Sequence, residues 1–276
     1  MNALRFPLAL LGGAVLAALV AVAVLAPLIA PYDARALAGD SLEQPSARHL
    51  LGTNNIGQDI FSQVIWGTRA SLAVAVGAAS LAVALGVLVG IGAGLVGGLA
   101  DVVAMRVVDV FLAVPRLPLL VLVAALVGAG RESVILLIAL ITWPVAARVL
   151  RSQTLTLRTR GFVRAVSGFG GGPFYVMRRH LVPNLGPILV AEFVAIASKA
   201  VLLEASLAFL GLADPTAVSW GLMLNRAVFQ PGLYFTPLWT WWVLPPGFAI
   251  ALAVLGFALL AVGLEPLMNP RWRRGL

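Results

Sequence analysis

Residues 71–99 read SLAVAVGAASLAVALGVLVGIGAGLVGGL and contain no charged side chain. About 20 apolar residues in a helix cross the hydrocarbon core of a bilayer, so this stretch predicts a membrane-spanning helix. The composition extends the pattern, because 61% of the 276 residues are hydrophobic and only 11% are charged. Soluble domains have about 25% charged residues. The chain is therefore predicted to be an all-α polytopic membrane protein, which excludes the soluble, disordered and disulfide-rich classes.

Five further apolar stretches accompany this one and bring the expected number of transmembrane helices to six. They are residues 6–30, 110–127, 134–150, 185–210 and 239–264. The first stretch could also be read as a signal peptide, but signal peptides have an apolar core of only about 7–15 residues. We therefore expect an uncleaved first helix.

The arginines predict the orientation of these helices. If the N-terminus is cytoplasmic, twelve arginines lie in the inner segments and five in the outer loops, and an excess of basic residues marks the cytoplasmic side. Both termini are thus predicted to be cytoplasmic, in a multi-pass protein of the inner (plasma) membrane. The net charge of +8 is explained by membrane orientation and lipid contact, with no need for nucleic acid.

The connections suggest two units. Residues 1–70 would hold the first helix and an outer segment whose acids, including Asp59, could contact a partner. Residues 71–276 would hold the other five helices and a basic cytoplasmic segment, residues 151–184, which has no acidic residue.

The second span carries glycines at a spacing of four, namely Gly86, Gly90, Gly94 and Gly98. Small residues at this spacing let another helix approach closely, so we expect a packed interface, with a partner in this chain or in another. The alternative is that glycine is simply frequent in membrane helices.

The fifth span carries Glu192, Lys199 and Glu204. Charges near the bilayer centre are unfavourable by about 2.5–3.5 kcal/mol each, so this helix is expected to face protein or water along its charged stripe. A polar translocation path is one interpretation. A buried interhelical charge pair, or charges reaching the interface, is the other.

Enzymatic signatures are missing. Lys199 is the only lysine and follows Ser198, so there is no Walker A lysine for ATP. His49 and His180 without cysteine give no zinc-ligand set, and the HExxH and GxSxG motifs are absent. We expect no catalytic residue, no metal site and no cofactor in this chain.

The basic segment predicts a helical hairpin. Its sequence GFVRAVSGFG (161–170) is followed by GGPFYVMRRHLVPN (171–184), which gives a helix, a glycine turn and a second helix opened by Pro173. With Phe162, Val163 and Phe169 it could dock onto a partner at the membrane surface, or lie on anionic lipid.

This segment resembles the EAA loop of binding-protein-dependent ABC importer permeases. Arg164, Ala165 and Val166 stand at the three motif positions, Gly170 at the motif glycine and Pro183 at the terminal proline. Arginine replaces the acid of the motif, which removes any salt bridge that a glutamate would make.

Other stretches are similar to the C-type permease of the dipeptide, oligopeptide and nickel family, over residues 45–276. LGTNNIGQDIFSQ (51–63) corresponds to the pattern LGTDxxGRDxxSR, from which Asn54, Gln58 and Gln63 depart. The other matching stretches are LEASLAFLG (203–211), SWG (219–221), WWVLPPG (241–247) and EPLMNPR (265–271).

The resemblance implies a type I ABC importer permease fold and several partners. These would be a second homologous permease, two ATPase subunits that bind ATP and Mg, and an extracytoplasmic substrate-binding protein. The coupling residues it implies are Phe162, Val163, Arg164, Ala165, Gly170 and Pro183. Peptides are favoured over nickel as cargo. An ion-gradient-driven secondary transporter using Glu192 and Glu204, and a structural membrane scaffold, are the alternatives of a different class.

Overall fold

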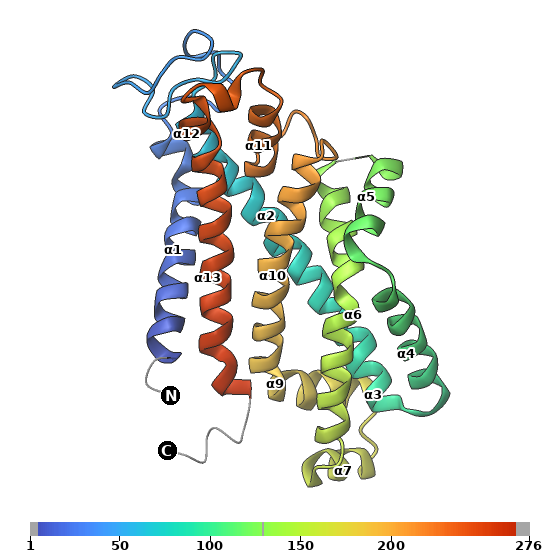
Figure 1. The fold of residues 1–276 in the computed structure, drawn as a ribbon. Coiled ribbons are helices and arrows are strands. Elements are labelled where there is room, and N and C mark those ends of the chain that lie inside the picture. Colours follow the sequence, from blue (N-terminus) through green and yellow to red (C-terminus); the bar gives the residue numbers. More distant parts are fainter. Residues whose placement is uncertain (1–4, 129, 269–276) are drawn as a thin grey trace.

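The computed structural model describes residues 5–128 and 130–268, and helices dominate, with no strand among these residues. Long helices lie side by side along the molecule (Figure 1). They are α1 (Arg5–Ile29), α2 (Ile60–Gly86), α6 (Arg131–Leu157), α10 (Gly186–Phe209) and α13 (Leu244–Met268).

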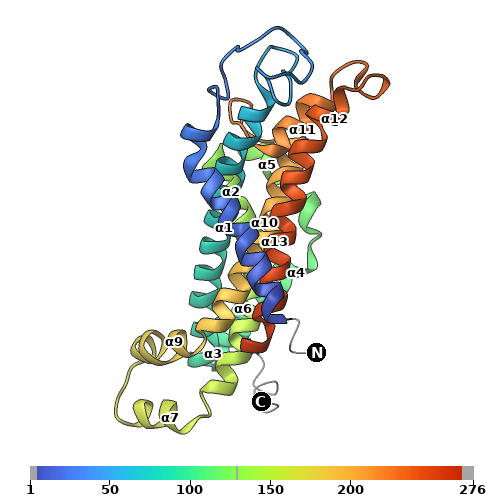
Figure 2. The same ribbon diagram turned by 90° about the vertical axis from the view of Figure 1, so that its left-hand side faces the viewer.

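The two ends of the bundle differ. The start of α1 and the end of α13 lie at the same end as α7 (Gly161–Gly168) and α9 (Val182–Asn184), here called the hairpin end (Figures 1 and 2). The opposite end, here called the loop end, carries residues 30–59 with α11 (Trp220–Val228) and α12 (Leu238–Trp242).

Four stretches of helix are long and apolar enough to cross a membrane: residues 7–29, 60–96, 131–157 and 238–265. A fifth crossing is possible if α4 (Gly98–Ala113) and α5 (Arg116–Val127), which are bent by 90° relative to each other, count as one span. The charged helix α10 is not among the four. It nevertheless lies alongside the other long helices in Figure 1.

The expected third span, residues 110–127, was wrong as a single helix. Val114 adopts an extended conformation (φ −82°, ψ 133°) between α4 and α5, and Pro115 follows it. Proline disfavours the helical region for the residue before it, so the chain turns here instead of continuing straight.

The second span begins earlier than residue 71. The Asp59 carboxylate accepts a hydrogen bond from the Ser62 backbone N–H at 2.8 Å, so it caps the start of α2. The predicted division at residues 70 and 71 therefore falls inside this helix. At its other end, α2 passes through a π-helical turn, η2 (Val87–Ile91), into the short α3 (Gly92–Val96).

Three of the four predicted ridge glycines face α6. A Cβ added to Gly86 would lie 2.7 Å from the Cβ of Ala146, one at Gly94 would lie 3.0 Å from the Cβ of Thr154, and one at Gly90 would overlap the Ala147 carbonyl oxygen. The partner helix is thus in the same chain. The prediction was wrong for Gly98, because it starts α4 beyond the break at Gly97 and a Cβ added there would meet nothing within 4 Å.

Candidate functional site

The hairpin at the end of α6 consists of α7, α8 (Pro173–Val176), the π-turn η3 (Met177–Leu181) and α9. One side of it is buried in an apolar cluster separate from the main core. This cluster joins Val163, Val176, Leu181 and Leu185 to Ile91 of η2, Leu150 of α6 and Ile188 of α10. The hairpin is therefore in contact with three segments of the helical bundle at once.

The other side of the hairpin exposes aromatic side chains. Phe169 is 92% exposed, Phe174 67% and Tyr175 55%. A cavity of about 760 Å³ opens there, lined by Phe174, Tyr175, Arg178, Arg179 and Pro183. Large exposed aromatics beside basic residues mark a surface suited to a protein partner.

The predicted coupling residues divide between these two sides. Phe162, Arg164, Ala165, Gly170 and Pro183 are exposed, while Val163 is only 2% exposed and anchors the hairpin. Gly170 has a φ of +86°, a left-handed conformation that favours glycine, and a Cβ there would meet nothing within 4 Å. Backbone conformation, not crowding, thus accounts for glycine in this turn.

The three charges of α10 lie on two faces of that helix. Glu204 is buried and accepts a hydrogen bond at 3.0 Å from the Ser71 hydroxyl of α2. Lys199 is exposed and Glu192 is half-buried. At about 100° per residue, Glu204 is turned roughly 120–140° from the other two. The expected single stripe of all three residues is therefore wrong. Glu192 and Lys199 lie on one face of α10, whereas Glu204 is buried where α10 packs against α2.

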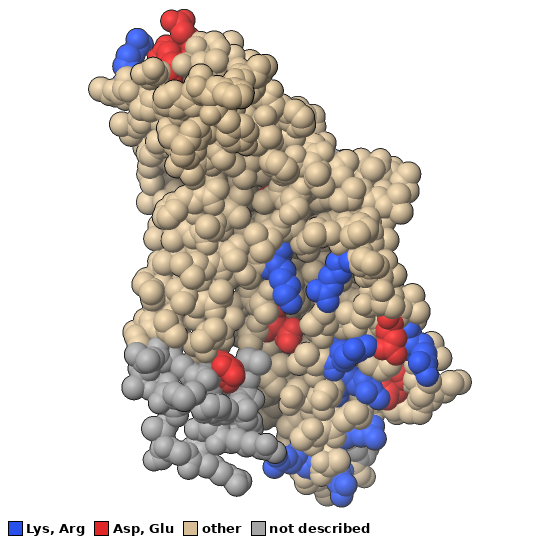
Figure 3. All heavy atoms as spheres, viewed as in Figure 1, with Lys and Arg blue, Asp and Glu red and all other residues tan. Residues whose placement is uncertain are grey.

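Figure 3 shows basic and acidic side chains emerging halfway along the face that α10 presents in Figure 1. The residues around them at this height carry no charge. Charges at that depth are unfavourable against lipid. Protein or water is accordingly a more favourable environment for this face than lipid.

The outer acid Asp59 was expected to be available to a partner, and this was wrong. It is 1% exposed, and its Oδ1 lies 2.9 Å from Nδ1 of His49, which is also buried. The carboxylate is occupied by His49 and by the N-terminus of α2.

The three departures from the pattern LGTDxxGRDxxSR are in contact with each other. The side-chain amides of Asn54 and Gln63 both donate to Oε1 of Gln58, at 3.0 and 2.7 Å. Gln63 also donates to the Ala34 carbonyl oxygen. Neutral amides here satisfy one another where the pattern has an acid and two arginines.

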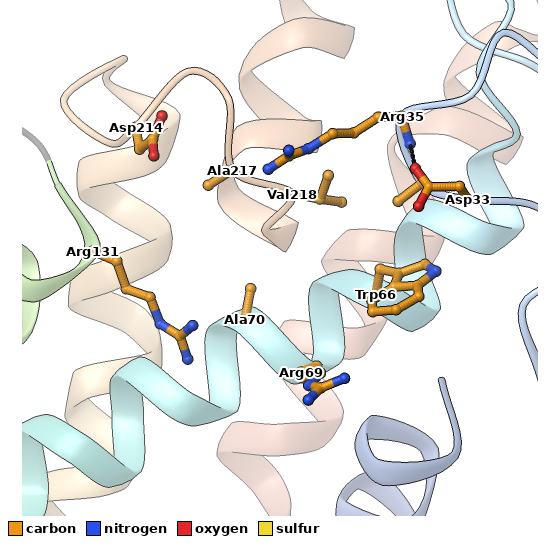
Figure 4. Close-up of a pocket in the computed structure, with 10 residues that line it drawn as sticks. Asp33, Arg35, Trp66, Arg69, Ala70, Arg131, Asp214, Ala217 and Val218 are labelled. Atoms are coloured by element: carbon orange, nitrogen blue, oxygen red, sulfur yellow. Dashed lines mark hydrogen bonds between the residues drawn. The ribbon is translucent and has the colours of Figure 1, made fainter. Parts of the chain in front are cut away.

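A charged cavity of about 380 Å³ opens toward the loop end, and sequence reasoning missed it (Figure 4). Its charged residues come from four segments: Asp33 and Arg35 from the loop after α1, Arg69 from α2, Arg131 from the start of α6 and Asp214 from the loop after α10. A hydrogen bond from the Thr216 hydroxyl, and then one from its backbone N–H, hold the pKa of the Asp214 carboxyl below its ordinary value. Asp214 is therefore ionised at neutral pH.

Ion pairs between α4 and α6 were also missed. Arg151 donates to both oxygens of Asp101, the second at 2.6 Å, and Arg148 donates to Asp109. The partners are far apart in sequence, so no local pattern pointed to them. Within residues 5–128 and 130–268, no group of three or more His, Asp or Glu could hold a metal ion.

Comparisons with known proteins agree on one family. The profile described as "Binding-protein-dependent transport system inner membrane component" matches residues 86–274, and that of the "N-terminal TM domain of oligopeptide transport permease C" matches residues 4–47. A Brucella suis protein named as a peptide permease is 41% identical over 82% of this chain and 74% of its own length. The glutathione transport system permease GsiD of Pectobacterium atrosepticum is 34% identical over 97% and 88%, and the dipeptide permease DppC of Bacillus subtilis 33% over 97% and 83%.

Proposed function

The chain belongs to the family of binding-protein-dependent transport system inner membrane components, and from this premise we propose that it forms half of a peptide translocation path with a second, homologous permease. Two ATPase subunits, which bind ATP and Mg, would drive the cycle from the cytoplasm. A substrate-binding protein would deliver peptide on the other side. The chain itself is a multi-pass inner membrane protein.

One observation carries this proposal: the hairpin is anchored on one side and exposes aromatics on the other. Val163 and its neighbours fix the hairpin to the bundle, while Phe169, Phe174 and Tyr175 are each more than half exposed. An ATPase surface would bury them. A surface helix that only lay on lipid would not need the cavity beside Phe174 and Pro183.

The anchoring cluster supplies a route for the movement. Ile91, Leu150 and Ile188 belong to η2, α6 and α10, and each packs in the cluster that holds Val163. Because packed cores move as units more readily than they deform, a shift of the hairpin would displace these three segments together. Closure of the ATPase dimer would in this way change the opening between the two permeases.

The path is assigned to the face with Glu192 and Lys199. Charge exposed halfway along a spanning helix is favourable only where protein or water covers it. The second permease would cover this face, with water in the path between the two chains. Four apolar stretches, the bent pair α4–α5 and α10 would together make six crossings. The arginine excess then puts the hairpin end and both termini in the cytoplasm.

Peptides are proposed as cargo, since the relatives are named for peptides, dipeptides and glutathione, itself a tripeptide. Specificity would rest first with the binding protein.

The test is purification of the tagged chain from its native membrane in gentle detergent, with mass spectrometry of what accompanies it. We expect a second permease and ATPase subunits, and ATP-dependent peptide uptake once the complex and its binding protein are reconstituted in liposomes. Uptake of nickel in place of peptide would overturn the assignment of peptides as cargo. Transport by the chain alone under an ion gradient, without ATP, would overturn the importer role.

A further inference from the structure

The charged cavity at the loop end contains more positive than negative groups, and these groups are not paired with one another. Three guanidinium groups line it, against two carboxylates (Figure 4). None of Arg35, Arg69 and Arg131 makes an ion pair with another described residue. Its volume of about 380 Å³ lies within the range of small-molecule sites, about 300–1,000 Å³.

The walls suit a short peptide. Ala70, Ala217 and Val218 supply apolar surface, and Trp66 places its ring 6.0 Å from the Arg69 guanidinium. The Trp66 Nε1–H is buried without a hydrogen-bond partner among the described residues. Arg35 extends across the opening toward Ala217 in Figure 4.

The cavity continues inward. A smaller cavity of about 40 Å³ shares Ala70, Arg131, Asp214 and Ala217 with it and is also lined by Glu204. Arg131 therefore stands where the outer cavity meets the buried carboxylate of α10. A solute bound in the outer cavity would lie next to the smaller cavity, where α10 contributes Glu204.

We infer that this cavity binds a zwitterionic peptide, with the peptide carboxylate held by Arg69 and Arg131 and the α-ammonium group by Asp214. Guanidinium groups recognise carboxylates through paired hydrogen bonds, and both arginines line the cavity. The two carboxylates make the site unsuited to a simple anion such as phosphate. This inference rests on the proposed function, because it names where the cargo of the importer is held.

The experiment uses the complete complex of both permeases and the ATPases in nanodiscs. Binding is measured in two states, one without nucleotide and one after trapping with vanadate. Equilibrium binding of radiolabelled trialanine is measured in competition with trialanine amide and N-acetyltrialanine. In the wild type we expect the amide and the acetyl form to compete about tenfold more weakly, which is the loss of one hydrogen-bonded charge.

Arg131→Gln should weaken trialanine binding about tenfold and abolish the preference over the amide, and Arg131→Lys should restore part of it. Asp214→Asn should instead abolish the preference over the acetyl form. The matched control is Arg48→Gln, an exposed arginine of the loop between α1 and α2 that does not line the cavity. It should bind like the wild type.

Two results would overturn the inference: a preference for the free carboxylate that survives Arg131→Gln, or an Arg131→Gln variant that loses affinity for the empty binding protein while trialanine binding is unchanged. The second would make the cavity a docking site for that protein. Failure of the proposed function looks different, since the wild-type complex with its binding protein would then show no ATP-driven trialanine uptake.

Discussion

The loop between α1 and α2 and the hairpin between α6 and α10 are fixed by different balances of contacts. In residues 30–59 most buried side chains are polar and satisfy one another, as His49 does with Asp59 and Asn54 with Gln58, while Leu42 and Leu51 add apolar contacts to the cluster around Trp242. The hairpin is attached through apolar contacts of Val163, Val176 and Leu181. Directional hydrogen bonds fix the geometry within the loop, whereas a close-packed apolar cluster passes the movement of one piece to the segments packed against it.

The difference predicts a division of labour. The loop is complete within this chain and gives α2 a fixed starting point. The hairpin leaves its aromatics exposed and, in the proposed role, would transmit movement. Substitutions in the loop should therefore lower stability first, and substitutions on the outer side of the hairpin should reduce coupling first.

The largest effect is expected from Asp59→Ala in the loop. The change removes the cap of α2 and leaves buried His49 without its partner, which should destabilise the chain by about 2–4 kcal/mol. The midpoint of thermal unfolding in detergent, at a fixed scan rate, measures this. Asp40→Asn, an exposed acid of the same loop, is the control and should unfold like the wild type. Equal midpoints for both variants would show that the loop network does not support α2.

Next comes Gly170→Val in the hairpin turn. A β-branched residue at φ +86° is strained by about 1–2 kcal/mol, so the turn should reorient and ATP hydrolysis should continue with uptake reduced about tenfold. Gly172→Val is the matched control, because Gly172 has an ordinary φ of −67° and free space around it. Normal uptake by Gly170→Val would contradict a role of this turn in coupling.

A smaller effect is expected from Phe169→Ala, which removes the most exposed aromatic of the hairpin. Loss of one interface aromatic should weaken ATPase binding by about 1 kcal/mol and leave the unfolding midpoint unchanged. Phe235→Ala removes a side chain that is 95% exposed at the loop end and should not affect ATPase recovery. The readout is the amount of ATPase that co-purifies with each variant. If both variants co-purify with the same amount of ATPase, Phe169 does not belong to the ATPase-binding surface.

Much of the fold could be predicted from sequence, because apolar length and glycine spacing are local signals. The ridge of Gly86, Gly90 and Gly94 is an example, and its failure at Gly98 follows from the break at Gly97. The bend before Pro115 could have been found from the proline itself. The hairpin motif marked exposed residues such as Gly170 and Pro183, but also Val163, which is buried, and it did not mark Phe174 or Tyr175.

Long-range charge contacts could not be predicted in the same way. Arg151 with Asp101, and the cavity shared by Arg35, Arg131 and Asp214, join segments that only the folded chain brings together. The amide set of Asn54, Gln58 and Gln63 is an intermediate case. Its three members were each visible as departures from a pattern, yet their mutual hydrogen bonds required the structure.

The smallest effect is expected from Arg148→Gln, which removes a polar contact between α6 and α4. Arg148 pairs with Asp109 where both side chains are about half exposed, 57% and 47%. Water already screens such a pair, so its loss should change the free energy of unfolding by less than about 1 kcal/mol. Arg151→Gln removes a two-pronged contact to an Asp101 side chain that is only 12% exposed, and it should lower the unfolding midpoint measurably more. If Arg148→Gln proved as destabilising as Arg151→Gln, exposure to water would not decide how much an ion pair between α4 and α6 contributes.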